Sequence, residues 1–307
     1  MRKHVRVVIL VACLLAAGGC VLAAPKVKAR AGKPRELWVA FTCSVNGKLA
    51  FCGTCGHIEY GAMPQKAAML KRWRNELPGP LIVLDSGNCL GFGSDARSAP
   101  VMVQAMDLCG YSVANVGDDE AAFGPRVLLD AAKGTSVQWV SCNVRLAKGD
   151  KQVFPASKIV KVGGLRVALI GVFDKRALPY GFPPSADLTV HDGIQCAKQE
   201  AQRLRGKYDV LIVLAHAPAD AMLDYARAVP EAALIAGGSQ MQRVPEPKMI
   251  GTTLVFQPAK YQIARVKLAL KGDKYVAARQ ERITVYKSAP VDEDVARMIE
   301  VYQKYGR

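Results

Sequence analysis

The sequence predicts an α/β fold whose sheets contain both parallel and antiparallel strands. In the first two thirds of its 307 residues, short apolar runs alternate with segments of helical spacing. The runs at residues 166–173 and 209–214 are apolar throughout, which is typical of central strands buried on both faces. Near the C-terminus, three strand-like runs follow one another without long helices between them, so the chain begins as α/β and ends in consecutive strands.

The individual elements follow from two periodicities. Alternating or continuous apolar residues indicate strands, and apolar residues three and four positions apart indicate helices. A group of prolines at 179, 183 and 184 indicates a loop after the strand at 166–173. The expected strands are 37–41, 81–85, 112–116, 137–140, 166–173, 209–214, 252–257, 263–270 and 275–286, and the expected helices are 63–77, 100–108, 192–205, 219–227 and 292–305.

Composition narrows the class of protein and its partners. Half of the chain is hydrophobic and 22% is charged, which excludes a collagen, a coiled coil and a mainly disordered chain. The formal net charge of +16 favours an anionic small-molecule ligand or an anionic membrane surface. Because the sequence contains no zinc finger, RNA-binding aromatic signature or helix-turn-helix, no nucleic-acid partner is expected.

The N-terminus has the features of a secretory signal peptide over residues 1–19. A positive region is followed by the apolar run 7–17 and by Gly18-Gly19-Cys20. The small residues before Cys20 resemble a bacterial lipobox with Ala17 in place of the usual Leu, which implies lipidation of Cys20. The expected location is then the periplasmic face of a bacterial membrane, with the lipid as anchor. Cleavage after Ala23 is the alternative and gives a soluble periplasmic protein.

Residues 20–36 form a basic linker between this lipidation site and the first strand. From Pro25 to Arg35 the linker holds five basic residues and no acidic residue. Such a segment suits an anionic membrane surface, but a simply solvated linker is an equally good interpretation.

Polar and thiol side chains follow the predicted strands. Ligands of α/β sheets gather beyond the carboxyl ends of the strands, so these positions are the candidate site. They comprise Thr42-Cys43-Ser44, Ser86-Gly87-Asn88-Cys89, Gly117-Asp118-Asp119-Glu120, Ser141-Cys142-Asn143, His216 and Gly237-Gly238-Ser239.

Seven motifs in order resemble the catalytic domain of the bacterial 5′-nucleotidase family, within the calcineurin-like metallophosphoesterases. The resemblance runs from about Leu37 to Leu270 and implies an αββα sandwich with mixed sheets. It places a single domain at 37–287, followed by a C-terminal helix at 288–307. No second, base-binding domain is expected, which weakens any claim of nucleotide specificity. The motifs are LIVLDSGN, GYSVANVGDDE, VSCNV, GLRVALIGV, VLIVLAH, ALIAGGS and KYQIARVKL.

Enzymes of this family hold two metal ions that orient the phosphate and supply a hydroxide nucleophile. By the resemblance, Asn88 stands where the family has Asp, Asp118 where it has Asn, and Asp119 where it has the catalytic His. His216 alone matches the family. The candidate metal ligands are therefore Asn88, Asp118 and His216, for a divalent ion such as Mn, Fe or Zn, and Asp119 is the candidate catalytic residue.

The remaining ligand slots have also changed. Ser44-Val45-Asn46 stands in place of the expected Asp-x-His, and the two late histidines of the family are Ser239 and Met241. Neutral amides and hydroxyls are poor ligands for a pair of divalent ions. A normal two-metal phosphatase is not expected.

A cysteine-rich loop suggests a second possible chemistry. Cys52, Cys55 and His57 lie together, and Cys43 could complete a Cys3His metal site. For the Cys-x-x-Cys pair we favour a structural disulfide, and a redox dithiol is the other alternative. The loop also resembles a divergent, Cys-rich branch of nucleotidase-like lipoproteins.

The other thiols allow two interpretations. Cys43, Cys89 and Cys142 each follow a different predicted strand, so they could hold a soft metal ion together with His216 and Asp118. The interpretation that we favour is that Cys89 and Cys142 are small buried residues, and that Cys109 and Cys196 belong to the core.

Three functions remain open from the sequence. The first is an exported lipoprotein with a metallophosphoesterase fold and a degenerate metal site, whose hydrolase activity is lost or altered. The second is an active metal-dependent phosphoester hydrolase with unusual ligands. The third is a thiol redox or soft-metal-binding protein that uses the loop of Cys52 and Cys55.

Overall fold

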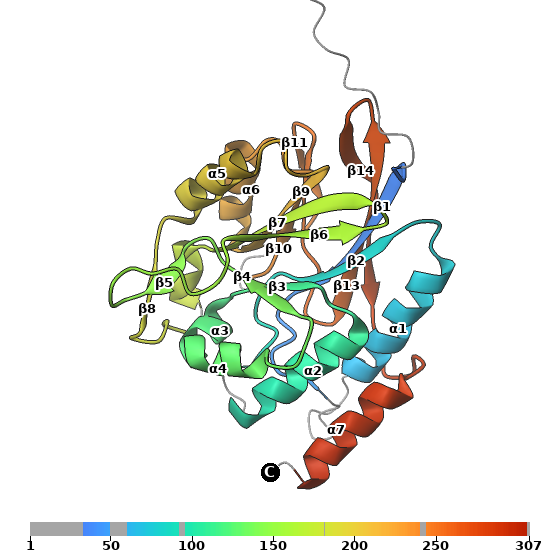
Figure 1. The fold of residues 1–307 in the computed structure, drawn as a ribbon. Helices are drawn as coiled ribbons and strands as arrows, with labels where there is room; N and C mark the ends of the chain where they lie inside the picture. The colour runs from blue at the N-terminus through green and yellow to red at the C-terminus, as the bar shows by residue number, and fades with distance from the viewer. Residues whose placement is uncertain (1–32, 50–59, 92–95, 181, 240–243, 306–307) are drawn as a thin grey trace, which may run out of the picture. The chain divides into compact units, whose positions relative to one another are not determined.

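The computed structural model describes residues 33–49, 60–91, 96–180, 182–239 and 244–305. Residues 32–307 form one compact unit in which two six-stranded sheets pack face to face, with helices on both outer faces (Figure 1). The expected αββα sandwich with mixed sheets is thus confirmed. None of the helices in the described ranges is both long enough and apolar enough to span a membrane.

The first sheet has the strand order β14-β13-β1-β2-β3-β4. Its strands β1 to β4 are parallel, and β13 runs antiparallel to β1. The strands are β1 (Glu36–Thr42), β2 (Leu81–Asp85), β3 (Val113–Asn115), β4 (Gln138–Val140), β13 (Gln262–Lys271) and β14 (Lys274–Thr284).

The second sheet has the order β11-β12-β10-β9-β7-β6. Its four central strands are parallel and both edge strands are antiparallel. A separate short pair, β5 (Val144–Leu146) and β8 (Leu188–Val190), lies beside it. The strands of the sheet are β6 (Ser157–Val162), β7 (Leu165–Phe173), β9 (Val210–His216), β10 (Leu234–Gly237), β11 (Lys248–Ile250) and β12 (Thr253–Phe256).

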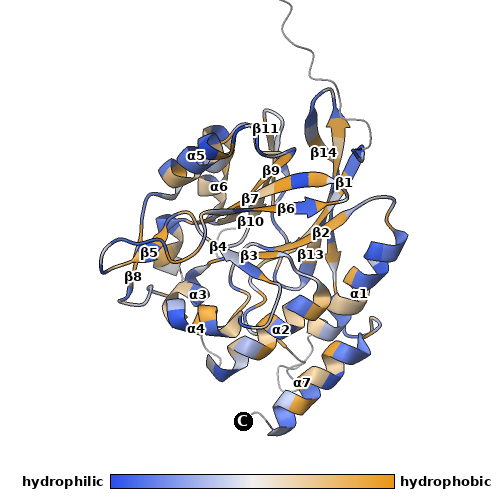
Figure 2. Ribbon diagram, in the orientation of Figure 1, coloured by the Kyte–Doolittle hydropathy of each residue, from blue (hydrophilic) through white to orange (hydrophobic). Residues whose placement is uncertain are grey.

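The helices divide between the two outer faces. Those on the first sheet are α1 (Met63–Glu76), α2 (Ala99–Cys109), α3 (Asp118–Phe123), α4 (Pro125–Ala131) and α7 (Glu293–Tyr305), whose buried residues join one apolar cluster. Helices α5 (Gly193–Leu204) and α6 (Ala219–Ala228) cover the second sheet. Figure 2 shows apolar strands inside and hydrophilic helix surfaces outside. Two 3-10 turns, Ala96–Ser98 and Lys175–Tyr180, complete the described elements.

The core between the sheets follows from the two-residue period of the strands. In β1, Leu37, Val39 and Phe41 face the other sheet, whereas Ala40 faces the helices. Phe41 meets Phe256 edge to face across the sandwich, with their ring centroids 6.2 Å apart. Because these side chains are fully buried, each stabilises the fold by about 1.5–3 kcal/mol. The sandwich holds the carboxyl ends of its parallel strands rigidly together.

Every strand and helix expected from the sequence is present, with bounds shifted by two residues or fewer. The expected strands lack β5, β6, β8, β10 and β11. The sequence pattern missed β6 because its SKIVKV alternates lysines with aliphatic residues and it is an edge strand with partly exposed faces. It also missed the short helices α3 and α4. Helix α7 buries Val295 and Ile299 against α1 and α2, within the same core as the rest of the sandwich.

Candidate functional site

The carboxyl ends of β1, β2, β3, β9 and β10 converge at one edge of the sandwich. Ser44, after β1, donates its backbone N–H to Gly87 O at 2.8 Å and its hydroxyl to Gly238 O at 2.9 Å. These two bonds connect three strand ends from both sheets. The polar residues that the sequence places after the strands are therefore neighbours in space, as expected.

Asp118 is the centre of this edge. It begins α3 directly after β3, and its Oδ1 lies 2.6 Å from His216 Nε2 and accepts a hydrogen bond of 2.8 Å from Asn88 Nδ2. Its Oδ2 accepts the backbone N–H of Phe182 at 3.1 Å. Burial by itself raises the pKa of Asp118, but the contacts with His216 and Asn88 outweigh burial and hold that pKa at about 2. Two of the three predicted metal ligands, Asn88 and His216, thus both contact the third, Asp118.

His216 ends β9 and is 1% exposed. Its Nε2 is close to Asp118, yet within the described ranges neither ring nitrogen has a hydrogen-bond partner in the direction of an N–H or a lone pair. Gly87 makes room for the ring, because a Cβ at Gly87 would lie 3.0 Å from His216 Nδ1, and the φ of Gly87 is +112°.

Hydrogen bonds at both the oxygen and the nitrogen of the Asn88 side-chain amide fix its orientation. Its Oδ1 accepts the backbone N–H of Asp119 at 3.2 Å, so its Nδ2 faces Asp118. The close approach requires Gly117, since a Cβ at that position would lie 2.0 Å from Asn88 Oδ1. The φ of Asn88 is +60°, a region in which Asn is among the more tolerated residues. The amide therefore acts as a hydrogen-bond donor toward the carboxylate at the centre of the site.

Asp119, the candidate catalytic residue, is 2% exposed. Its Oδ2 accepts a hydrogen bond from Asn46 Nδ2 at 3.3 Å. The structure thus places it at the edge of the same site, against the segment that follows β1.

Glu120 is a member of the site whose role the sequence did not reveal. Its carboxylate is fully buried and accepts three backbone N–H groups, from Asn88 at 2.7 Å, Leu90 at 2.9 Å and Gly117 at 2.9 Å. Burial raises its pKa, and these hydrogen bonds act against burial. Glu120 holds the loop after β2 against the start of α3 and so positions Asn88 beside Asp118.

A further buried carboxyl group, that of Asp85, lies at the end of β2. Asp85 accepts hydrogen bonds from Thr42 Oγ1 at 2.6 Å and from the backbone N–H of Gly87 at 2.9 Å. The Thr42 hydroxyl also lies 2.9 Å from the hydroxyl of Tyr111. Burial raises the pKa of Asp85 to about 7. The sequence identified Asp85 only as the last residue of a strand.

Next to His216, β7 ends in another polar group that the sequence missed. Asp174 N donates to His216 O, and the Asp174 carboxylate accepts from Arg176 and from the Tyr225 hydroxyl. A cavity of about 310 Å³ opens here, between this turn and the first residues of α5. Because Arg176 also binds Asp224 at 2.8 Å, its guanidinium is neutralised by surrounding carboxylates.

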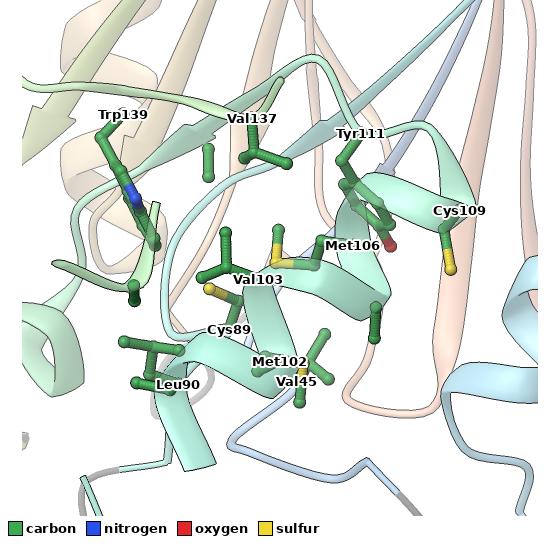
Figure 3. Close-up of a cluster of buried hydrophobic side chains, with 14 of the residues drawn as sticks. Val45, Cys89, Leu90, Met102, Val103, Met106, Cys109, Tyr111, Val137 and Trp139 are labelled. Carbon is green, nitrogen blue, oxygen red and sulfur yellow. The ribbon is translucent and has the colours of Figure 1, made fainter. Parts of the chain in front are cut away.

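The thiols do not form a soft-metal site within the described residues. Cys89 packs among apolar side chains of α2, as Figure 3 shows, while Cys142 belongs to the core under α5 and α6. Cys43 is fully buried and its Sγ lies 3.4 Å from Pro258 O. Burial raises the pKa of both the Cys89 and Cys142 thiols well above the usual range, so neither is a ready thiolate. The interpretation of Cys89 and Cys142 as small buried residues fits this structure.

The predicted Cys52–Cys55 loop with His57, and the lipidation site Cys20, lie outside the described residues. Their chemistry stays a prediction, including the proposed metal site with Cys43. His191 does not belong to the site, because its Nε2 pairs with Asp150 Oδ1 at 2.6 Å on the surface.

The donor set does not fit a pair of divalent ions. In the ranges that the structure describes, no group of three or more His, Cys, Asp or Glu side chains converges as a metal site would require. One carboxylate and one imidazole face each other, and amide donors of Asn88 and Asn46 are directed at the two neighbouring carboxylates.

Solved structures with the same fold include nucleotidases and a calcineurin-like phosphoesterase. The 5′-nucleotidase precursor from Thermus thermophilus superimposes with a TM-score of 0.73 at 20% identity, over 88% of this chain and 58% of the other. The calcineurin-like phosphoesterase YfkN from Bacillus subtilis gives 0.71 at 15% identity, over 88% and 97%. The sulfate thiohydrolase SoxB, also from Thermus thermophilus, gives 0.69 at 16% identity, over 88% and 61%.

These likenesses are structural. No family model and no curated protein sequence matches the chain. The chain spans a little over half the length of the nucleotidases it superimposes on. At such low sequence identity the superpositions establish the fold: this chain has the architecture of the 5′-nucleotidases and calcineurin-like phosphoesterases.

Proposed function

We propose that this protein is an exported, lipid-anchored relative of the 5′-nucleotidases that no longer hydrolyses phosphoesters through a two-metal centre. The observation that carries the proposal is the hydrogen bond of 2.8 Å from Asn88 Nδ2 to Asp118 Oδ1. A carboxylate that binds a metal ion offers its lone pairs to the cation. Here an amide N–H takes up one of those lone pairs.

Two neighbouring carboxylate oxygens also accept hydrogen bonds from the protein, where a metal site would hold a cation. Asn46 Nδ2 donates to Asp119 Oδ2 at 3.3 Å, and the backbone N–H of Phe182 donates to Asp118 Oδ2. Buried carboxylates need a cation or hydrogen-bond donors as compensation. At this edge the chain supplies its own donors, so the charges are stabilised without a second ion.

A second candidate function is favoured by one observation at His216. Its two ring nitrogens lack directed hydrogen bonds in the described part of the chain, and Nε2 meets Asp118 Oδ1 at 2.6 Å. An imidazole nitrogen and a carboxylate oxygen that lie side by side are the kinds of donor that a single ion such as Zn, Mn or Fe accepts. In this alternative the protein keeps one ion, and with it an altered hydrolase activity.

Elemental analysis separates the two candidates. The protein is purified without chelators or affinity metal, and its Mn, Fe and Zn contents are measured beside those of His216→Ala. The proposal expects less than stoichiometric metal in both, and no turnover of a chromogenic phosphodiester with added Mn²⁺. Stoichiometric metal that is lost in His216→Ala, together with metal-dependent turnover, would reject the proposal and establish the one-ion hydrolase.

Export and anchoring rest on the sequence features of residues 1–20. Mass spectrometry of the membrane fraction is the direct test. The proposal expects a mature N-terminus at Cys20 that carries a diacylglyceryl group, and loss of that modification in Cys20→Ser. An N-terminus at Ala24 in the soluble fraction would instead establish the soluble periplasmic protein.

A further inference from the structure

Exposed basic side chains collect at the amino ends of the strands, opposite the candidate site. Arg35 precedes β1, Lys161 lies near the end of β6, Lys207 precedes β9, and Lys271 and Lys274 flank the β13–β14 turn. All five are exposed, and none forms an ion pair within the described part of the chain. We call these five side chains the basic end. Their charge is available to a partner.

Three of the five are held together by the first sheet. The backbone N–H of Leu270 donates to Arg35 O at 2.9 Å, which places Arg35 beside the end of β13. Lys271 and Lys274 are cross-strand partners in the hairpin that follows. Figure 1 shows this hairpin beside the start of β1. One exposed acid, Asp273, lies at the tip of the hairpin, so the group keeps a net positive charge.

The second sheet brings the other two to the same end. The β6–β7 turn packs on the first sheet at Gly163, where an added Cβ would lie 2.6 Å from Pro80 Cβ. Lys161 precedes this turn and pairs in register with Arg166. Arg166 in turn binds Asp209, two residues after Lys207, at 3.0 Å. The basic end therefore combines residues from strand ends of both sheets.

The chain also enters the sandwich here. Lys33 forms an ion pair with Asp209, and the Tyr275 hydroxyl donates to Pro34 O at 2.5 Å. Lys33 and Pro34 are therefore held at the same end of the sandwich as the five exposed basic side chains.

Several charges elsewhere on the surface are paired. On the face of the first sheet that carries α1, Glu281 binds both Arg265 and Arg279. Helix α7 carries both signs, with Glu293, Asp294, Arg297, Glu300 and Lys304. Exposed lysines without an ion pair among the described residues also include Lys148, Lys151 and Lys198, and the basic end differs from these in lying at strand ends of both sheets.

We infer that the basic end docks on the headgroups of an anionic lipid bilayer. Lysine and arginine side chains near such a surface are attracted within about one Debye length, so several that lie on one face act together. This inference rests on the export proposed above. In this orientation the candidate site, at the other end of the strands, faces away from the membrane.

Vesicle sedimentation of the full chain tests the inference. Every variant carries Cys20→Ser, so that acylation cannot contribute and a failed anchor proposal is distinguishable from a failed docking surface. Binding is compared on phosphatidylcholine vesicles with and without phosphatidylglycerol. The test variant is Lys161→Glu, Lys271→Glu, Lys274→Glu. The matched control is Lys148→Glu, Lys151→Glu, Lys198→Glu, which makes the same charge change at exposed lysines outside the basic end.

The parent protein is expected to prefer the anionic vesicles, with a preference that falls as salt rises. The test variant should lose about 100-fold of that preference and the control less than about threefold. A version with Gln at the three test positions, checked for an unchanged melting temperature, should show an intermediate loss. Equal loss in test and control variants, absence of any preference in the parent, or binding of polyphosphate without binding of vesicles would each overturn the inference.

Discussion

The two ends of the sandwich treat their charged side chains in opposite ways. At the carboxyl ends of the strands, Asp118, Glu120 and Asp85 are buried, and each accepts two or more hydrogen bonds. At the amino ends, Lys161 and Lys274 are exposed and have no ion-pair partner among the described residues. At the carboxyl ends the charges are compensated by hydrogen bonds within the protein, whereas at the amino ends these lysine charges are exposed.

This difference indicates where binding energy is available. A buried charge must be compensated inside the protein, and once its lone pairs are occupied, a ligand gains little by displacing the donors. An exposed lysine keeps its charge for an external partner. The candidate site and the exposed basic side chains are therefore at opposite ends of the sandwich.

The largest loss of stability is expected when the buried carboxylate of Glu120, at the carboxyl ends of the strands, is removed. Glu120→Ala leaves three buried backbone N–H groups without their acceptor and is expected to lower the free energy of unfolding by about 3–5 kcal/mol. Urea denaturation measures the loss. The exposed Glu246 gives the control, because Glu246→Ala should change stability by less than about 0.5 kcal/mol. A loss below about 1 kcal/mol for Glu120→Ala would show that the site is not held closed by this carboxylate.

The next effect concerns pH and Asp85. Its folded-state pKa of about 7 lies above the ordinary value of 3.8, so the folded state binds the proton more tightly than the unfolded state. The resulting stability is fully present below the unfolded pKa and is lost as pH rises toward 7. Relative to Asp85→Asn, the wild type should therefore lose stability between about pH 4 and 7. The size of the Asp85 pKa shift makes the expected loss on the order of a few kcal/mol.

Thr42→Val sharpens this prediction. The Thr42 hydroxyl donates to the Asp85 carboxylate and favours its charged form. Removing the donor should move the loss of stability to higher pH, which denaturation across a pH series would detect. A wild-type profile parallel to that of Asp85→Asn throughout would contradict the assignment.

A smaller effect is expected at the amino ends of the strands from Asp209, which neutralises Lys33 and Arg166. Asp209→Asn should lower stability by about 1–2 kcal/mol, since both cations are partly solvated. It should also raise binding to anionic vesicles about fivefold, because one negative charge leaves the docking surface. Weaker vesicle binding than in the parent would argue that Asp209 itself shapes the surface.

The smallest effect lies between the two ends, on the face of the first sheet. Arg279→Ala removes an exposed partner of Glu281, which keeps its bond to Arg265, and should cost less than about 0.5 kcal/mol. Arg265→Ala should cost more, because its guanidinium also lies 4.6 Å from the centroid of the Trp73 ring. Thermal denaturation of the two variants compares them, and equal losses would exclude the aromatic contribution.

The sequence was informative where a single period decides the structure. The strands at 81–85 and 166–173 were found because continuous apolar residues admit few other interpretations. The position of Asp118 and His216 beside each other was predictable from the convergence of parallel strand ends. The seven ordered motifs supplied the αββα arrangement, which the periodicities alone did not.

The contacts that close the site could not be read from the sequence. The role of Glu120 depends on three backbone N–H groups, two of them some thirty residues away in the chain. The amide of Asn88 became a donor only because Asp119 N occupies its oxygen. Local sequence patterns do not encode such pairings. The hypothesis of a soft-metal site at Cys43, Cys89 and Cys142 is not supported within the described residues, because side chains that follow strands at one edge of a sheet can still point into different cores.

The hydrogen bond between Asn88 and Asp118 also constrains how this sequence can change. Asn88→Asp alone would replace a donor by an acceptor and set two negative oxygens near the 2.8 Å separation that the amide now has from Asp118. That single step is unfavourable unless a cation arrives with it or Asp118 changes at the same time. The two positions are therefore expected to be coupled, because they share one hydrogen bond.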